Sequence, residues 1–181
     1  EEGSTLVSTI EEMAANYLEA IRRVQLEGPY ILAGWSFGGF VVYEMAQEPR
    51  ANDPNTIVHV VMLGSIAKPP DHDVHVTEEA LLEFFYWELV WFERTHAEVE
   101  ALPAELTVDE KLDHIVERAI FNGVLPSGTS RSTIRRLYGL FQANWNALMN
   151  YRPKATNADV ALLRASGPLP PALMPMHLAA G

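Results

Sequence analysis

Apolar positions in the first third of the chain alternate between the spacing of a helix and that of a strand. Between residues 8 and 25 they lie three and four apart, which predicts an amphipathic helix. Ser8 and Glu11 have the spacing of a capping box and place the start of this helix. Apolar runs at residues 30–33 and 57–63 predict strands separated by a second helix, and the longer run indicates a strand covered on both faces. This order indicates an α/β fold with a parallel sheet.

After the second strand the pattern becomes helical. A helix rich in aromatic side chains begins near residue 77, and two more are expected at about 108–121 and 130–150. The next strand is predicted only at residues 159–164. Because a crossover between parallel strands usually needs little more than ten residues, we expect an inserted helical lid at about 66–157. Most aromatic side chains of its first helix are expected in the core.

Composition and charge limit the classes of protein to which the chain can belong. The chain of 181 residues is 48% apolar and 20% charged, which is typical of one globular domain. A net charge of −11 disfavours a nucleic-acid partner, and no apolar run is long enough to span a membrane. The absence of cysteine excludes disulfides, a cysteine nucleophile and thiolate metal sites. It also fits the cytosol, so we expect a cytoplasmic protein.

One motif indicates chemistry. Gly34–Gly38 matches the G-x-S-x-G nucleophile elbow, with a predicted strand before it and a helix after it. Such a turn lifts the hydroxyl of Ser36 clear of the sheet, and the flanking Gly34 and Gly38 are expected because side chains there would collide. The backbone N–H of Phe37 would then be one donor to the oxyanion formed on attack. The motif predicts that Ser36 is the nucleophile of a serine hydrolase.

No base or acid for this serine is evident. Six histidines are available: His59, His72, His75, His96, His114 and His177. His59 lies in a predicted buried strand and is expected to be a hydrogen-bonded core residue. Two others lie on lid helices, two come too early for the order serine, acid, histidine, and the last follows no adjacent strand. Asp71 and Asp73 fit turns in a proline-rich loop better than a catalytic acid.

Several stretches together resemble one family. They are Ile10–Leu18, Gly28–Tyr30, the elbow, Asn122–Pro126, Tyr151–Pro153 and Val160–Ala165. In these residues, over nearly the whole chain, the sequence is similar to the terminal (type I) thioesterase domains of nonribosomal peptide and polyketide synthases, members of the α/β-hydrolase superfamily. The resemblance implies a partner, an adjacent carrier domain whose phosphopantetheine arm delivers an acyl or peptidyl chain to Ser36. Release follows by hydrolysis or macrocyclisation, beneath the lid and without a metal or diffusible cofactor.

The chain departs from the family at three places. Gly64 occupies the position where the family has its Asp, so the acid is unknown. The family's catalytic His follows the last strand, and we expect it beyond Gly181. The first strands, which supply a second oxyanion donor, would precede Glu1. The sequence therefore resembles the middle of a thioesterase, and we expect this segment alone to be marginally stable or prone to aggregation, with a sheet edge and one core flank uncovered.

Two other functions stay open. The chain could be a free-standing serine esterase or lipase on the same scaffold, or a catalytically impaired domain that only binds an acyl chain or a carrier, as Gly64 suggests. Arg131, Arg135 and Arg136 are candidates for docking an acidic carrier or its phosphate, although a solvated helix face is the simpler explanation.

Overall fold

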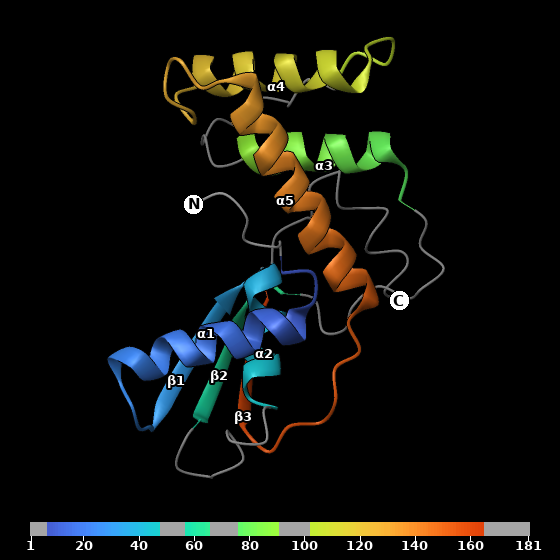
Figure 1. Cartoon of the computed structure of the whole chain (residues 1–181). Coiled ribbons are helices and arrows are strands. Elements are labelled where there is room, and N and C mark those ends of the chain that lie inside the picture. Colours follow the sequence, from blue (N-terminus) through green and yellow to red (C-terminus); the bar gives the residue numbers. More distant parts are fainter. Residues whose placement is uncertain (1–6, 48–56, 66–75, 91–101, 165–181) are drawn as a thin grey trace. The chain divides into compact units, whose positions relative to one another are not determined.

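The chain forms two compact units. The computed structural model describes residues 7–47, 57–65, 76–90 and 102–164, which Figure 1 draws as coloured ribbon. The sheet unit contains the described residues up to 65 together with 143–164, and the helical unit contains those from 76 to 142. No helix within the described ranges is long and apolar enough to cross a membrane.

The sheet unit is a three-stranded parallel sheet with two helices. Its strands are β1 (Tyr30–Trp35), β2 (Ile57–Leu63) and β3 (Asp159–Leu163), in the spatial order β1-β2-β3. Helices α1 (Ile10–Val24) and α2 (Phe37–Met45) pack together against one face of the sheet (Figure 1). The predicted α/β fold with a parallel sheet is confirmed.

Described residues cover only one face of β1 and β2, and all five residues of β3 are exposed. Side chains along β1 alternate, so that Leu32 is buried while Ile31 is 70% exposed. His59 of β2, which is exposed, is in register with Ile31. At the other end of the sheet, Trp35, Leu63 and Leu163 are in register with one another, and all three are exposed. The prediction that the second strand is covered on both faces is therefore wrong here, because α1 and α2 bury alternate side chains on one side only.

The start of α1 differs from the prediction by one residue. Thr9, not Ser8, is the N-cap, and its hydroxyl accepts a hydrogen bond from the Glu12 N–H at 3.1 Å. The Glu12 carboxylate accepts from the Ser8 N–H at 3.2 Å. The predicted box between Ser8 and Glu11 is wrong, because a start at Thr9 brings Ile10 into the core, where it is fully buried.

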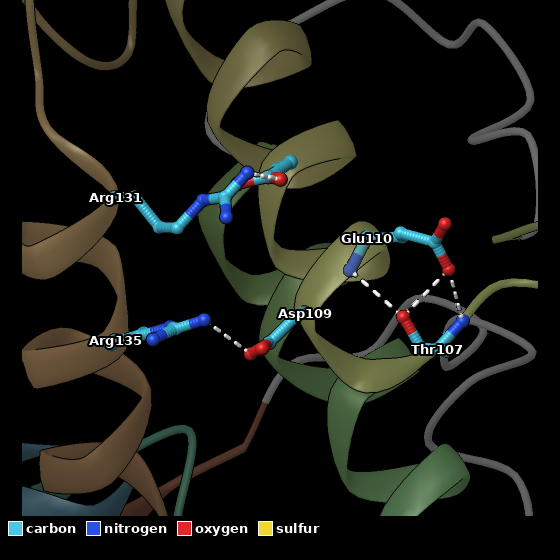
Figure 2. Close-up of polar contacts among 6 residues, drawn as sticks. Thr107, Asp109, Glu110, Arg131 and Arg135 are labelled. Carbon is cyan, nitrogen blue, oxygen red and sulfur yellow. Dashed lines mark hydrogen bonds and ion pairs between the residues drawn. The ribbon is translucent and has the colours of Figure 1, made fainter.

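The helical unit is built from α3 (Glu78–Val90), α4 (Val108–Phe121) and the first part of α5 (Arg131–Asn150). The spacing of Thr107 and Glu110 predicts a capping box for α4, and the structure confirms it (Figure 2). The hydrogen bonds from the Thr107 side chain and backbone lower the pKa of the Glu110 carboxyl. The core of the helical unit consists of Leu82, Phe85, Tyr86, Leu102, Leu112, Ile115, Val116, Ile134 and Tyr138.

The aromatic side chains of α3 lie in the core only in part, because Phe84 and Trp87 are half-buried. Phe85 and Tyr86 are buried, and the rings of Phe84 and Phe85 each lie with their centroids 5.4 Å from that of Phe141. Trp91 and Phe92 lie outside the described residues. The helical unit falls inside the predicted lid, 66–157, whose function as a lid stays a prediction.

Candidate active site at Ser36

Ser36 joins β1 to α2 in an unusual backbone conformation. Its φ is 50° and its ψ is −119°, and among the described residues it is the only one other than glycine with a positive φ. An L-residue rarely adopts this region, and such a conformation persists only when the surrounding structure holds it. This is the sharp turn from strand to helix that the motif predicts.

Three hydrogen bonds hold the backbone of Ser36. Its N–H donates to the Leu63 carbonyl at 2.8 Å, which extends the pairing of β1 with β2. Its carbonyl accepts from the Gly39 N–H at 3.1 Å and from the Ser65 hydroxyl at 2.7 Å. Ser65 is buried, so its hydroxyl needs the partner that Ser36 provides. Nothing in the local sequence pattern links Ser65 to the elbow, so this contact is not predictable from the sequence.

The glycines of the elbow differ in how tightly they are confined. A Cβ added at Gly34 would lie 2.1 Å from the Gly38 carbonyl oxygen, and one at Gly39 would lie 2.0 Å from Ser65 Oγ. A Cβ at Gly38 would meet no described atom within 4 Å. The predicted steric need for glycine is thus confirmed at Gly34, where the crowding atoms belong to the backbone of Gly38. It is wrong at Gly38, where the space around an added Cβ is open. The second tight position is Gly39.

The N-terminus of α2 suits a developing negative charge. Phe37 is the first residue of α2, and the first N–H groups of a helix have no acceptor one turn earlier. These N–H groups and the helix dipole favour an anion at this end. As far as the structure describes the chain, the Ser36 side chain makes no capping hydrogen bond to α2. The role of the Phe37 N–H as an oxyanion donor stays a prediction.

Gly64 continues the sheet hydrogen bonding beside the elbow. Its N–H donates to the Leu163 carbonyl at 2.8 Å, and its φ is 61°, which favours glycine. A Cβ at this position would lie 3.1 Å from the indole Nε1 of Trp35, so an Asp would need a small shift of that ring. Gly64, which is expected at the family's acid position, therefore has a backbone conformation that favours glycine.

His59, the one histidine described in the sheet unit, does not lie at Ser36. His59 is half-exposed rather than a core residue, so that expectation is wrong: it lies on the uncovered face of β2. Its Nδ1 is 3.6 Å from Asp159 Oδ2. His59 lies four residues before Leu63, whose carbonyl accepts the hydrogen bond from Ser36. His59 and Leu63 are therefore about 13 Å apart along the strand.

The other candidate bases and acids are not placed relative to Ser36. His114 belongs to the helical unit, where its ring centroid lies 6.3 Å from that of Tyr86. The remaining candidates lie outside the described residues: His72, His75, His96, His177, Asp71 and Asp73. The identities of the base and the acid therefore stay open. Within the described ranges, no group of three or more His, Asp or Glu side chains could hold a metal ion.

Two of the arginines proposed for carrier docking are paired with acidic residues (Figure 2). Arg131 of α5 binds the carboxylate of Asp113, and Arg135 binds that of Asp109 at 2.6 Å. Both acids belong to α4. These pairs reduce the positive charge that Arg131 and Arg135 can offer a partner, which favours a structural role for both.

Comparison with known proteins identifies the family. A family model described as "Thioesterase domain" matches residues 1–120. The nonribosomal peptide synthetase apvA of Aspergillus terreus is 34% identical over 123 residues, which cover 65% of this chain and 13% of that protein. The dimodular nonribosomal peptide synthase of Bacillus subtilis is 41% identical over 73 residues, covering 40% of this chain and 3% of that protein. The chain thus spans a small part of these relatives.

Solved structures that resemble this chain also come from nonribosomal peptide synthetases or are thioesterase domains. A four-domain nonribosomal peptide synthetase, crystallised with AMP and glycine, matches with a TM-score of 0.79 and 28% identity over 96% of this chain and 14% of that one. The NocB thioesterase domain matches with a TM-score of 0.51 and 23% identity over 90% of this chain and 56% of that one, which supports the fold alone. These likenesses confirm the α/β-hydrolase type of fold and the resemblance to terminal thioesterase domains of nonribosomal peptide synthetases. The chain belongs to the thioesterase domain family.

Proposed function

We propose that this domain releases an acyl or peptidyl chain from the phosphopantetheine arm of a carrier domain, and that Ser36 is its nucleophile. The observation that carries the proposal is the backbone of Ser36, which has a φ of 50° between a strand and a helix N-terminus in a chain of the thioesterase family. The names of the relatives, which are nonribosomal peptide synthetases, support a carrier domain as the partner.

The proposed reaction has two steps. The Ser36 hydroxyl attacks the thioester carbonyl, its proton passes to a base, and the Phe37 N–H donates to the oxyanion. The carbon–sulfur bond then breaks, the arm leaves as a thiol and the chain stays on Ser36 as an ester. Water or an internal nucleophile next attacks this ester, giving an acid or a macrocycle and freeing the hydroxyl. We propose that the base is a histidine beyond Gly181, and that neither step needs a metal or a diffusible cofactor.

Replacement of Ser36 tests the proposal. In the full-length protein that contains this chain, Ser36→Ala should lower acyl release from a loaded carrier by at least about a thousandfold, because the covalent route is lost. A fluorophosphonate should label Ser36 in the unmodified protein. Ser8→Ala, at an exposed serine, is the matched control and should keep full activity. Full turnover by Ser36→Ala would exclude this serine. A comparison of loaded carrier with a simple ester separates the thioesterase from a free-standing esterase or lipase.

A second candidate is a catalytically impaired domain that binds an acyl chain or a carrier. The observation that favours it is Gly64, whose φ of 61° and contact distance to Trp35 fit glycine at the family's acid position. Loss of the acid typically lowers the rate by several orders of magnitude but leaves some activity. Labelling of Ser36 with little or no turnover would favour this candidate, whereas turnover of loaded carrier at a rate that needs an intact acid and base would exclude it.

A further inference from the structure

The C-terminal end of α2 forms hydrogen bonds with the segment that follows α5. Tyr43 and Glu44 lie four and three residues before Gln47, so their side chains flank that of Gln47 at the end of the helix. All three form hydrogen bonds with residues 151–154, more than a hundred positions later in the chain. All of these residues belong to the sheet unit. The end of α2 farthest from Ser36 is therefore fixed by its own set of contacts.

Tyr151 is at the centre of these contacts. Its side chain is 1% exposed, and its hydroxyl donates to Glu44 Oε2 at 2.7 Å and accepts from Gln47 Nε2 at 3.1 Å. Its ring packs edge to face with Phe40, with the centroids 6.2 Å apart. Burial first, and then the hydrogen bond to Glu44 and its charge, raise the pKa of Tyr151 far above its usual value. This shift favours the protonated hydroxyl, which is the form that donates to Glu44.

The backbone around Lys154 completes the attachment. The Lys154 N–H donates to Gln47 Oε1 at 2.9 Å, and its carbonyl accepts from the Tyr43 hydroxyl at 2.8 Å. The Thr156 hydroxyl donates to the carbonyl of Ala46, the C-cap of α2, at 3.2 Å. The N–H and the carbonyl of Lys154 are thus both bound by side chains at the end of α2. In turn, the Ala46 carbonyl at that end is bound by the Thr156 side chain.

These contacts matter because α2 is short. An isolated helix of nine residues is not stable, so its direction depends on what holds each end. Ser65 and the tight approach at Gly39 hold the first turn, and the Tyr151 contacts hold the last. We propose that Tyr151 is a positioning residue, which sets the direction of α2 and with it the place of the Phe37 N–H relative to Ser36. This inference rests on the proposed function of Ser36.

Tyr151→Phe in the full-length protein is the direct test, because it keeps the ring and removes the hydroxyl. At a temperature well below the melting point, we expect fluorophosphonate labelling of Ser36 to slow about tenfold, since small misplacements of reacting groups are costly. Amide hydrogen exchange at residues 37–41 should become faster. Glu44→Gln, which keeps an acceptor, should behave like the unmodified protein, whereas Glu44→Leu should behave like Tyr151→Phe. Tyr17→Phe, at a tyrosine that is 56% exposed, is the control.

The outcomes separate this inference from the proposed function. A lower melting temperature with unchanged labelling and unchanged exchange at residues 37–41 would make Tyr151 purely structural and overturn the inference. If the unmodified protein is not labelled at Ser36, the proposed function fails, and the exchange measurement alone decides whether Tyr151 orders the first turn of α2. If Tyr151→Phe does not fold, the pair Glu44→Gln and Glu44→Leu carries the test, and equal behaviour of these two would contradict the inference.

Discussion

The turn at Ser36 and the helices of the helical unit are held by different kinds of contact. At the turn, backbone atoms approach so closely that a Cβ on Gly34 would lie 2.1 Å from the Gly38 carbonyl oxygen. In the helical unit, apolar side chains such as Phe85 and Ile115 fill the core, and a Cβ on Gly139 of α5 would meet no described atom within 4 Å. Backbone atoms cannot move away without breaking the turn, whereas side chains can repack, so the two regions should differ sharply in their tolerance of substitution.

Matched glycine replacements test this difference most directly. Gly34→Ala should destabilise the full-length protein by about 3 kcal/mol or more, because the added carbon meets backbone. Gly139→Ala adds the same carbon inside a helix with open space and should stabilise by up to about 1 kcal/mol. Chemical denaturation of the two variants gives both values. Similar effects at the two sites would show that the turn is not as confined as its geometry indicates.

Gly39 and Ser65 provide an intermediate case, because the clash there is with a side chain. Gly39→Ala should cost about 2 kcal/mol, since its Cβ would lie 2.0 Å from Ser65 Oγ and 3.0 Å from Ser65 Cβ. Ser65→Gly removes both atoms but also the hydrogen bond to the Ser36 carbonyl, and should cost about 1 to 2 kcal/mol alone.

The double variant, Gly39→Ala with Ser65→Gly, should lose clearly less than the sum of the two single losses, because one change relieves the clash that the other creates. Gly38→Ala, at a helical position with open space, is the control and should not destabilise the protein. Stabilities from urea unfolding of the four proteins complete the cycle. Strict additivity would mean that the side chain of Ser65 does not limit the space at Gly39.

The sequence predicts those parts of the site whose constraints are local. Gly34 can be interpreted from the motif because the oxygen that crowds it lies four residues away. Ser65 could not be found in this way, since it reaches Ser36 across 29 residues and nothing in the local pattern marks it. The contacts of Tyr151 with Glu44 and Gln47 span 107 and 104 residues, and they too depend on the folded chain.

The same limit explains two errors in the predicted fold. Ser8 and Thr9 each precede an acidic residue by three positions, so the capping pattern fits both, and only the packing of Ile10 distinguishes them. Along β1 and β2, apolar side chains occupy both faces, and the pattern does not say which face the helices cover. By contrast, the sequence predicts the start of α4 correctly, because Thr107 and Glu110 form the one capping box that fits there.

The smallest effect is expected at the ion pair between Arg135 and Asp109. Their side chains are 46% and 61% exposed, so solvent and salt weaken the attraction across the 2.6 Å contact. A double-mutant cycle with Arg135→Ala and Asp109→Ala should give a coupling of about 0.5 kcal/mol, which falls as salt is raised. Exchanging the two charges, Arg135→Asp with Asp109→Arg, should restore most of this coupling. A coupling above about 2 kcal/mol, unchanged by salt, would mean that exposed charge pairs, rather than side-chain packing, hold α4 against α5.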